Sequence, residues 1–168
     1  MLAALRRDGL PARLRLAGPM PPAQRGRLLT HATASGIVGA VDLLGERAPH
    51  EVARLLVEAA LLVVPAAVGG PAARDGGHGG SDPVLAVLAG CAAGTPVLAA
   101  DGPAVRAVAA LLPGVTVLGP DAPDDAWARA AVGPLPVPPT PDERWAALRR
   151  LRRSPFCAQG PTLADEHR

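Results

Sequence analysis

The residues best suited to chemistry lie in a glycine-rich loop and at the start of the helical pattern that follows it. The loop at 76–80 leads into Ser81 and Asp82, directly before an apolar segment. Backbone N–H groups at a helix N-terminus, together with the helix dipole, can hold an anion such as a phosphate. Gly79, Gly80 and Ser81 are therefore candidate ligands for a diphosphate, with the Ser81 hydroxyl as an additional donor.

Asp82 supports a second interpretation of the same helix start. Aspartate is a good N-cap residue, because its carboxylate accepts the N–H groups that a phosphate would otherwise use. The same negative charge also repels a phosphate. The alternative is therefore an ordinary Asp-capped helix that follows a glycine loop, and the sequence leaves both interpretations open.

Two other groups of titratable residues have simpler explanations than catalysis. His78 can act as a mobile acid or base, but no cysteine or second histidine is spaced to form a metal site with it, and a solvated loop histidine is the favoured interpretation. Asp124 and Asp125 are adjacent carboxylates at the start of an expected helix, where the helix dipole stabilises them. We therefore assign no metal site and no catalytic residue.

The segment after the glycine loop has clear helix and strand signals. Pro83 suits the first position of a helix, and Gly94 is placed for the left-handed residue that ends one. A strand at 97–100 follows the Thr95-Pro96 pair. Apolar residues leave no wide polar side on the helix, which we expect to be buried nearly all round; they are Val84, Leu85, Val87, Leu88 and Cys91.

Short apolar segments alternate with helical patterns along the whole chain. This alternation is typical of βαβ units around a parallel sheet. The expected strands are 13–17, 38–44, 61–64, 97–100 and 115–118. The expected helices are 1–7, 24–34, one opening at Pro49, 83–93, 103–111, 123–127 and one opening at Pro141.

The chain is expected to be one α/β domain with an appended helix. The domain spans 1–131, a proline-rich linker spans 132–140, and a basic helix and tail span 141–168. Thr140, with Glu143 three residues later, forms a capping-box signal. The favoured interpretation of this helix is a solvated basic face whose apolar stripe, including Trp145, packs on the domain; contact with an anionic membrane surface is the alternative.

Composition excludes several classes of protein. The chain has 168 residues, a formal net charge of +2 and 2% aromatic residues, so its core must consist of Ala, Val and Leu. A thinly spread charge does not support a general nucleic-acid surface. Cys91 and Cys157 are far apart and indicate free thiols in a reducing compartment. No apolar region follows the N-terminal arginines as in a signal peptide, and we expect a cytoplasmic protein.

The stretch 81–101 resembles the signature segment of the family 4 (group 1) retaining glycosyltransferases. In that family a loop of the type E-G-F-G-L-P opens a helix that ends in C-G-T-P-V, and the helix N-terminus receives the diphosphate of a nucleotide-sugar. The family has the GT-B fold of two Rossmann-like halves. The order of elements resembles its C-terminal, donor-binding half, which implies a three-layer Rossmann-like α/β domain with a mostly parallel sheet.

Other segments resemble the family in the same order. The segment 59–65 is similar to A-D-L-F-V-L-P, and 101–108 is similar to D-x-P-x-x-R-E-V, with Arg106 kept and Ala107 where glutamate is usual. Arg47 falls in the loop where the family approaches the base of the nucleotide. The resemblance therefore implies a donor-binding set made of Arg47, Gly79, Gly80, Ser81, Asp82 and Thr95.

The sequence departs from the family at its acidic motif. Two glutamates eight positions apart contact the sugar and the ribose in the family, and they fall on Ser81 and Ala89 here. Loss of two charge-assisted hydrogen bonds, each of about 1.5–3 kcal/mol, weakens donor binding by roughly a hundredfold or more. We therefore expect feeble transfer at best.

The family's first strand and its G-R-L…K segment also have no counterpart before Leu2. In the family's strand order this strand is a central one. The strands at 13–17 and 61–64 are therefore expected either to pair directly or to be separated by another segment.

The resemblance predicts the donor half of a glycosyltransferase that transfers a glycosyl group to an unknown acceptor when complete. We expect this chain to be truncated and catalytically impaired. A nucleotide-diphosphate sugar is expected as donor substrate, with no separate cofactor, and a separate N-terminal GT-B half as partner; nucleic acid is not expected. The alternative is a non-catalytic interaction or scaffold domain derived from a glycosyltransferase.

Overall fold

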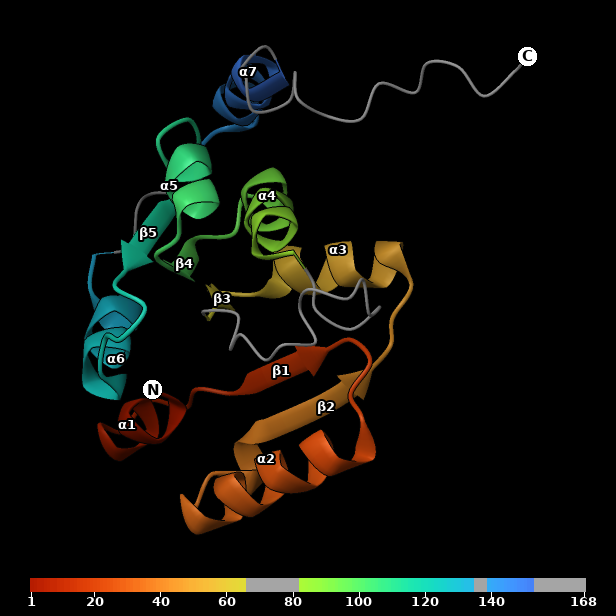
Figure 1. Cartoon of the computed structure of the whole chain (residues 1–168), viewed down its shortest axis with the longest axis vertical. Helices are drawn as coiled ribbons and strands as arrows, with labels where there is room; N and C mark the ends of the chain where they lie inside the picture. The colour runs from red at the N-terminus through yellow and green to blue at the C-terminus, as the bar shows by residue number, and fades with distance from the viewer. Residues whose placement is uncertain (66–81, 135–138, 153–168) are drawn as a thin grey trace.

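Short parallel strands form two separate sheets in the computed structural model of the chain, which describes residues 1–65, 82–134 and 139–152 (Figure 1). One sheet has the order β1-β2 and the other has the order β3-β4-β5, and every pairing is parallel. This confirms the predicted α/β class. The strands are β1 (Leu14–Ala17), β2 (Val41–Gly45), β3 (Leu62–Val64), β4 (Val97–Ala100) and β5 (Val115–Leu118).

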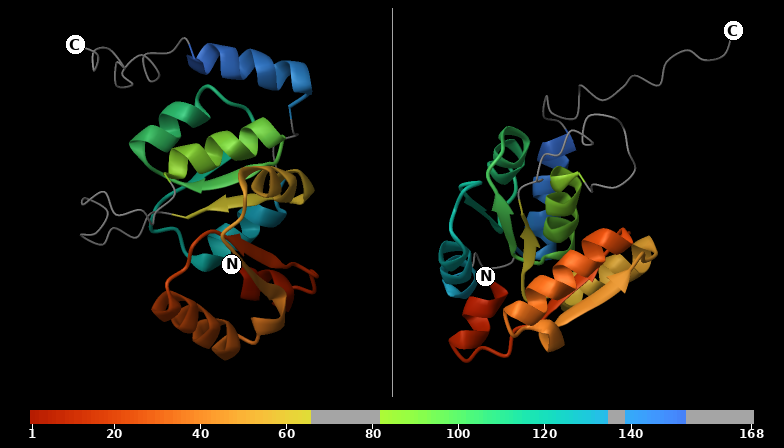
Figure 2. Two further views of the ribbon diagram at one scale, coloured as in Figure 1. Left: turned by 90° about the vertical axis from the view of Figure 1, so that its right-hand side faces the viewer. Right: turned by 60° about the horizontal axis from the view of Figure 1, so that its bottom comes forward.

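Helices cover the larger sheet on both sides. Figures 1 and 2 show α4 and α5 on one side of β3-β4-β5 and α6 on the other, whereas α2 lies beside the smaller sheet. The larger sheet therefore forms the middle of three layers. The helices are α1 (Leu2–Arg7), α2 (Pro22–Ala34), the 3-10 helix η1 (Val38–Ala40), α3 (Pro49–Glu58), α4 (Pro83–Ala93), α5 (Pro103–Ala109), α6 (Asp124–Val132) and α7 (Pro141–Arg152).

The main core lies where α4 and α5 pack on β3 and β4. All four residues of β4 are buried, as expected for a parallel strand covered on both faces. Gly90 lets α4 approach the sheet closely, because a Cβ atom there would lie 2.7 Å from both Leu62 Cδ2 and Val97 Cγ2. The members of this core are small aliphatic residues with one cysteine: Val64, Val84, Val87, Cys91, Val97, Ala99, Val105, Val108, Leu112 and Ala147.

Both ends of α4 form as the sequence predicts. The Asp82 side chain accepts a hydrogen bond from the Val84 N–H at 2.9 Å, and Gly94 adopts the left-handed conformation with φ of 79°. The expectation that α4 is buried nearly all round is wrong, because Leu85 is 63% exposed and Ala89 is also exposed. Helices α3 and α5 and the sheet cover three sides of α4. The fourth side carries small or isolated apolar residues, and such residues are commonly exposed to solvent.

The smaller sheet has little core of its own. Every residue of β1 and β2 is half-buried or exposed. Helix α1, which precedes β1, packs on α6 beside the larger sheet. The Met1 amino group at the start of α1 lies 3.1 Å from Asp124 Oδ2 of α6. Two-stranded sheets are marginally stable by themselves, so this half depends on these contacts.

The strands at 13–17 and 61–64 do not pair directly, and the alternative that another segment separates them stays a prediction, because residues 66–81 lie outside the described part of the chain. β1 pairs with β2 and β3 pairs with β4, and no strand lies between β1 and β3 in the part of the chain that the structure describes. One bridge between the two halves is the ion pair of Arg15 Nη1 with Glu58 Oε2, at 3.3 Å.

Some predicted boundaries are also corrected. The strand expected at 38–44 begins only at Val41, because Ala40 donates its N–H to Ile37 O at 2.8 Å and closes a 3-10 turn that includes Gly39, a poor strand former. Helix α6 continues past Trp127 to Val132. Helix α2 begins two residues before Gln24, at a proline that suits a first helical position.

Helix α7 contacts the domain through Arg144 and Ala147, and Trp145 takes no part in this contact. Its capping box is confirmed, since Glu143 Oε2 accepts the Thr140 N–H at 2.8 Å. Arg144 Nη1 donates to Ala92 O at 3.1 Å, and Ala147 is buried. Trp145 is 63% exposed, so the prediction that it packs on the domain is wrong; the side chains of Leu148 and Leu151, the other apolar residues of this stripe, lie outside the described residues.

We predict that Gly90→Ala destabilises the protein by about 1–3 kcal/mol, because the added methyl overpacks the α4–sheet contact. Urea unfolding followed by circular dichroism measures the change. Gly26→Ala is the matched control, since Gly26 lies in α2 with nothing within 4 Å of the added Cβ; it should stabilise by about 0.5–1 kcal/mol. A Gly90→Ala protein as stable as wild type would contradict the close packing.

Candidate functional site

The candidate site lies along the carboxyl ends of the parallel strands. Ligands of open α/β sheets bind there, because loops and helix N-termini converge at this edge. Asp101 follows β4 directly, Arg47 follows β2 by two residues, and Asp82 caps the helix that the chain enters after β3. All three residues therefore follow the carboxyl end of a strand: Arg47 in the smaller sheet, and Asp82 and Asp101 in the larger one.

The Asp82 carboxylate already occupies one donor of the α4 N-terminus. Its Oδ1 accepts the Val84 N–H, and the residue is exposed to solvent. A phosphate at this helix start would compete with the carboxylate for backbone donors and would meet its negative charge. The geometry therefore agrees with the Asp-capped interpretation, and it leaves the other N-terminal donors for a ligand.

Asp101 and Arg106 form a pair at the carboxyl end of β4 that the predicted site did not include. Arg106 Nε lies 2.8 Å from Asp101 Oδ1, an oxygen that is buried and makes no well-aligned hydrogen bond. The Asp101 N–H donates to Leu118 O at 2.6 Å, which holds the loop against β5. The signal in the sequence was a polar residue directly after a fully apolar strand, at the end where ligands bind.

Arg47 is partly exposed and loosely held. Its Nη1 lies 3.7 Å from Glu51 Oε1. The other oxygen of Glu51 accepts the Ala48 N–H at 3.0 Å and so caps α3. Exposed ion pairs of this kind contribute about 0–1 kcal/mol, so the Arg47 guanidinium can leave Glu51 at little cost.

Thr95 lies away from this group. It is buried at the C-terminal end of α4, and its hydroxyl donates to Leu56 O at 2.5 Å. Asp82 is at the other end of the same helix, roughly 16 Å away for 11 residues. Thr95 therefore joins α3 to the start of β4, and the structure does not bring it together with Asp82.

The remaining predicted residues are only partly visible. Gly79, Gly80, Ser81 and His78 lie outside the residues that the structure describes. Ala89 is exposed on α4, two turns after the helix start, and its methyl group offers no hydrogen-bond acceptor.

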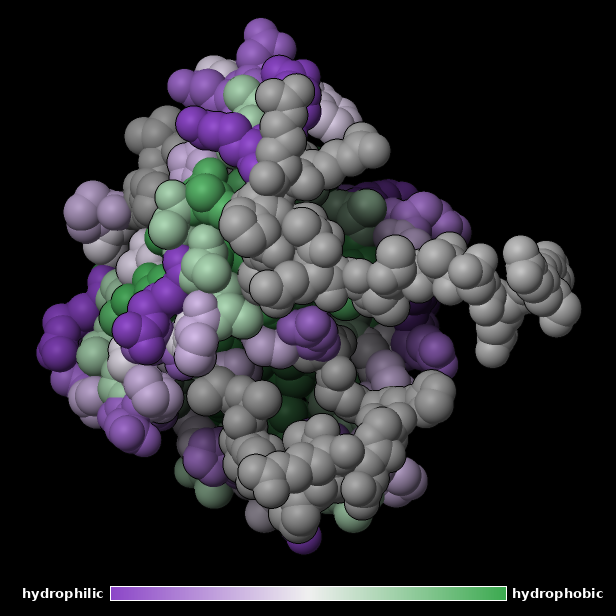
Figure 3. All heavy atoms as spheres, turned by 45° about the horizontal axis from the view of Figure 1, so that its top comes forward, coloured by the Kyte–Doolittle hydropathy of each residue, from purple (hydrophilic) through white to green (hydrophobic). Residues whose placement is uncertain are grey.

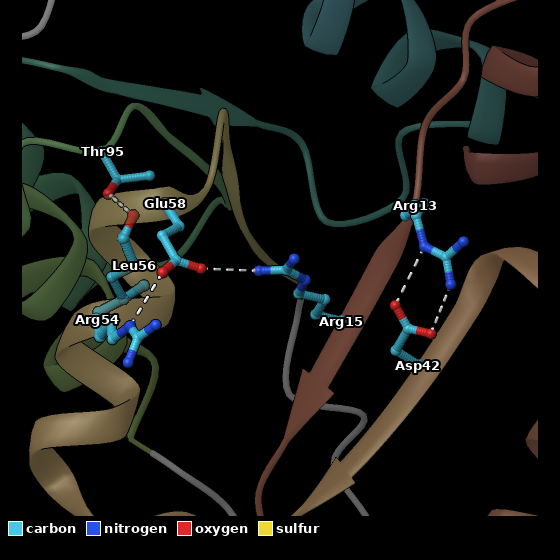
Figure 4. Close-up of polar contacts among 7 residues, drawn as sticks. All are labelled: Arg13, Arg15, Asp42, Arg54, Leu56, Glu58 and Thr95. Carbon is cyan, nitrogen blue, oxygen red and sulfur yellow. Dashed lines mark hydrogen bonds and ion pairs between the residues drawn. The ribbon is translucent and has the colours of Figure 1, made fainter.

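Two separate groups of charged side chains lie near the smaller sheet (Figure 4). Glu58 pairs with Arg54 and Arg15, and Asp42 pairs with Arg13. Hydrogen bonds from Arg54 and then Arg15 lower the pKa of Glu58, and the hydrogen bond from Arg13 lowers the pKa of Asp42. Both carboxylates therefore remain charged near neutral pH, as members of structural ion pairs do.

Two further classes of chemistry find no support in the described part of the chain. Burial raises the pKa of the Cys91 thiol to about 11, so it is not an activated nucleophile. Residues 1–65, 82–134 and 139–152 contain no group of three or more His, Cys, Asp or Glu side chains that could hold a metal ion. None of their helices is both long and apolar enough to span a membrane.

Comparison with solved structures finds a glycosyltransferase with a similar fold. The chain is similar to AviGT4, a glycosyltransferase involved in avilamycin A biosynthesis, with 25% sequence identity and a TM-score of 0.58. The chain has a glycosyltransferase-like fold. The match covers 88% of this chain and 40% of the AviGT4 chain, so the chain spans less than half the length of that enzyme. Scans against family models and curated proteins gave no match.

We predict that Thr95→Val costs about 1–2 kcal/mol of stability, because the hydrogen bond from the buried Thr95 hydroxyl to Leu56 O is lost. Nucleotide affinity should not change, since Thr95 lies far from Asp82. Thr116→Val in β5, a half-buried position, is the matched control and should stay within about 0.5 kcal/mol. Thermal unfolding and calorimetric titration report the two effects; an affinity loss at full stability would return Thr95 to the binding site.

Proposed function

We propose that this chain is a nucleotide-sugar-binding half of a glycosyltransferase, of the family 4 retaining type, with impaired transfer. The diphosphate of the donor binds at the N-terminus of α4, and Arg47 approaches the nucleotide from the loop after β2. A separate GT-B half supplies the acceptor site. Gly79, Gly80 and Ser81 belong to the same proposed site by their place in the sequence.

The similarity to AviGT4 carries this proposal. It extends over nearly the whole chain at 25% identity, and AviGT4 is itself a glycosyltransferase. The α4 N-terminus supports the assignment, because it follows the strand end at which α/β folds bind ligands and has backbone donors left for an anion.

Two features argue for weak or absent transfer. The Asp82 carboxylate competes with the phosphate for donors, and an exposed methyl stands at Ala89, where the family has an acceptor for ribose hydroxyls. Transfer chemistry in such a site depends on fixed electrostatic stabilisation of the leaving diphosphate, and both changes reduce it.

Calorimetric titration of the purified chain with UDP, GDP and ADP tests binding directly. We predict saturable binding of at least one nucleotide, strengthened by about threefold to tenfold in Asp82→Gly. Removal of a like charge near the phosphate is worth on the order of 1 kcal/mol, and glycine remains an acceptable N-cap.

Asp142→Asn is the matched control for this titration. It removes the same charge from the first turn of α7, away from the strand ends, and should leave nucleotide affinity unchanged. No heat with any nucleotide, from a chain shown to be folded, would overturn the proposal.

A second variant tests the missing acceptor at position 89. We predict that Ala89→Glu raises nucleotide affinity by about tenfold, because a carboxylate can accept the ribose hydroxyls in charge-assisted hydrogen bonds. The exposed position accommodates the longer side chain. Ala92→Glu, one turn further along α4 and also exposed, is the control and should have no effect; equal changes in both variants would point to a general charge effect.

The second candidate function is a non-catalytic interaction domain that keeps the scaffold. The capped helix start at Asp82 and the exposed Ala89 favour it, since neither feature suits donor binding. The same titrations separate the two functions, because a scaffold domain binds no nucleotide in either the wild type or the Asp82→Gly protein.

A further inference from the structure

Helix α7 packs on the C-terminal end of α4, at the end of the molecule away from the smaller sheet (Figures 1 and 2). Arg144 makes the polar contact, because its Nη1 donates to Ala92 O at 3.1 Å. The same guanidinium lies against the backbone of Gly94, where a Cβ atom would be only 2.5 Å from Nη1. Arg144 therefore reaches both the last turn of α4 and the residue that ends it.

This arginine supplies a donor that α4 lacks at its own end. The last carbonyl groups of a helix have no helical N–H partner. The N–H groups of the two residues after α4 bond to Cys91 O and Gly90 O, at 3.1 and 3.0 Å. The Ala92 carbonyl accepts from Arg144 instead, and the helix dipole favours a positive charge at this position. Arg144 thus completes the C-terminal cap of α4 from a different element.

The contact between α7 and the domain is imperfectly packed. Arg144 Nε is buried and has no hydrogen-bond partner among the described residues. A small cavity of about 10 Å³ lies between α7 and the domain, and its lining includes Cys91, Leu112 and Ala147 besides Arg144. A buried donor without a protein acceptor costs free energy, and so does a gap between packed surfaces. Opening of α7 recovers part of this cost, because it exposes Nε to water.

The rest of the domain keeps its own hydrogen bonds when α7 leaves. The described strand ladders involve no residue of α7, and the left-handed turn after α4 is closed by groups of that turn itself. Figure 3, with the α7 end of the molecule turned forward, shows mainly hydrophilic surface there. The exposed residues of α7 are Asp142, Glu143, Trp145, Arg149 and Arg150.

We propose that α7 is a strap that opens and closes on α4 as a unit while the domain stays folded, with Arg144 as its latch. In the closed state α7 covers Cys91, which is 6% exposed and lines the cavity beside Arg144 and Ala147. Opening exposes this thiol, so its rate of modification reports the fraction of open molecules. The thiol serves only as the reporter, and the proposal does not rest on nucleotide binding.

Alkylation of Cys91 with iodoacetamide, read by mass spectrometry, tests the strap in a Cys157→Ser background, which leaves Cys91 as the one thiol. We expect slow labelling whose rate does not change at low urea and rises only where the whole domain unfolds. Opening of one helix exposes little surface, whereas global unfolding depends steeply on urea. A rate that follows global unfolding from the first addition of urea would overturn the proposal, as would labelling as fast as in the unfolded chain.

Arg144→Ala tests the latch. We expect Cys91 to be labelled at least about tenfold faster, because the closed state loses its charged hydrogen bond to the Ala92 carbonyl. Arg149→Ala is the matched control: it removes the same type of side chain from the exposed face of α7 and should leave the rate unchanged. An unchanged rate in a folded Arg144→Ala protein would overturn the proposal.

Arg144→Lys is the second variant, for the case in which alanine prevents folding. It keeps a positive charge near the end of α4 but loses the planar guanidinium, so labelling should be about threefold faster than in wild type. Hydrogen exchange supplies a second readout for both variants: the amides of α7 should exchange faster, whereas those of β4 keep their protection. Equal loss of protection in α7 and β4 would mean that the whole domain is destabilised, and it would overturn the strap.

Discussion

The close approach of α4 to β3 and β4 is the contact on which the rest of the structure depends. At Gly90 the helix backbone meets the side chains of Leu62 and Val97, one from each strand, with no room for a methyl between them. This contact fixes the height of the helix above the sheet, and the left-handed turn at Gly94 returns the chain directly into β4. The Asp82 end of the helix then lies at the strand ends where a ligand can bind.

Burial is distributed unevenly around that contact, and this affects the candidate site. Val87, Val97 and Val108 are completely buried in the larger unit, whereas no residue of β1 or β2 is. Local stability follows buried apolar contact, so the loop that carries Arg47 is held less firmly than the start of α4. A ligand that touches both must order the loop that carries Arg47 when it binds, and this ordering lowers its affinity.

Local signals in the sequence predicted the elements, and tertiary packing decided what the sequence left open. The N-cap at Asp82 and the turn at Gly94 follow from one residue each, and both are confirmed. The exposure of Leu85 and Trp145 could not be predicted from apolar character, because it depends on where α3, α5 and α7 come to lie. In the same way, no local pattern states that Thr95 bonds to α3 rather than facing a ligand.

The charges at the candidate edge indicate which arginine is free to meet a phosphate. Arg106 is held 2.8 Å from a buried oxygen of Asp101, and its withdrawal would leave that oxygen without a counter-charge. Arg47 lies 3.7 Å from Glu51 in an exposed pair, and Glu51 keeps its backbone bond at the start of α3 when the arginine leaves. A phosphate must also overcome the charge of Asp82. Because moving Arg47 away from its partner costs less free energy than moving Arg106, nucleotide affinity should depend more on Arg47 than on Arg106.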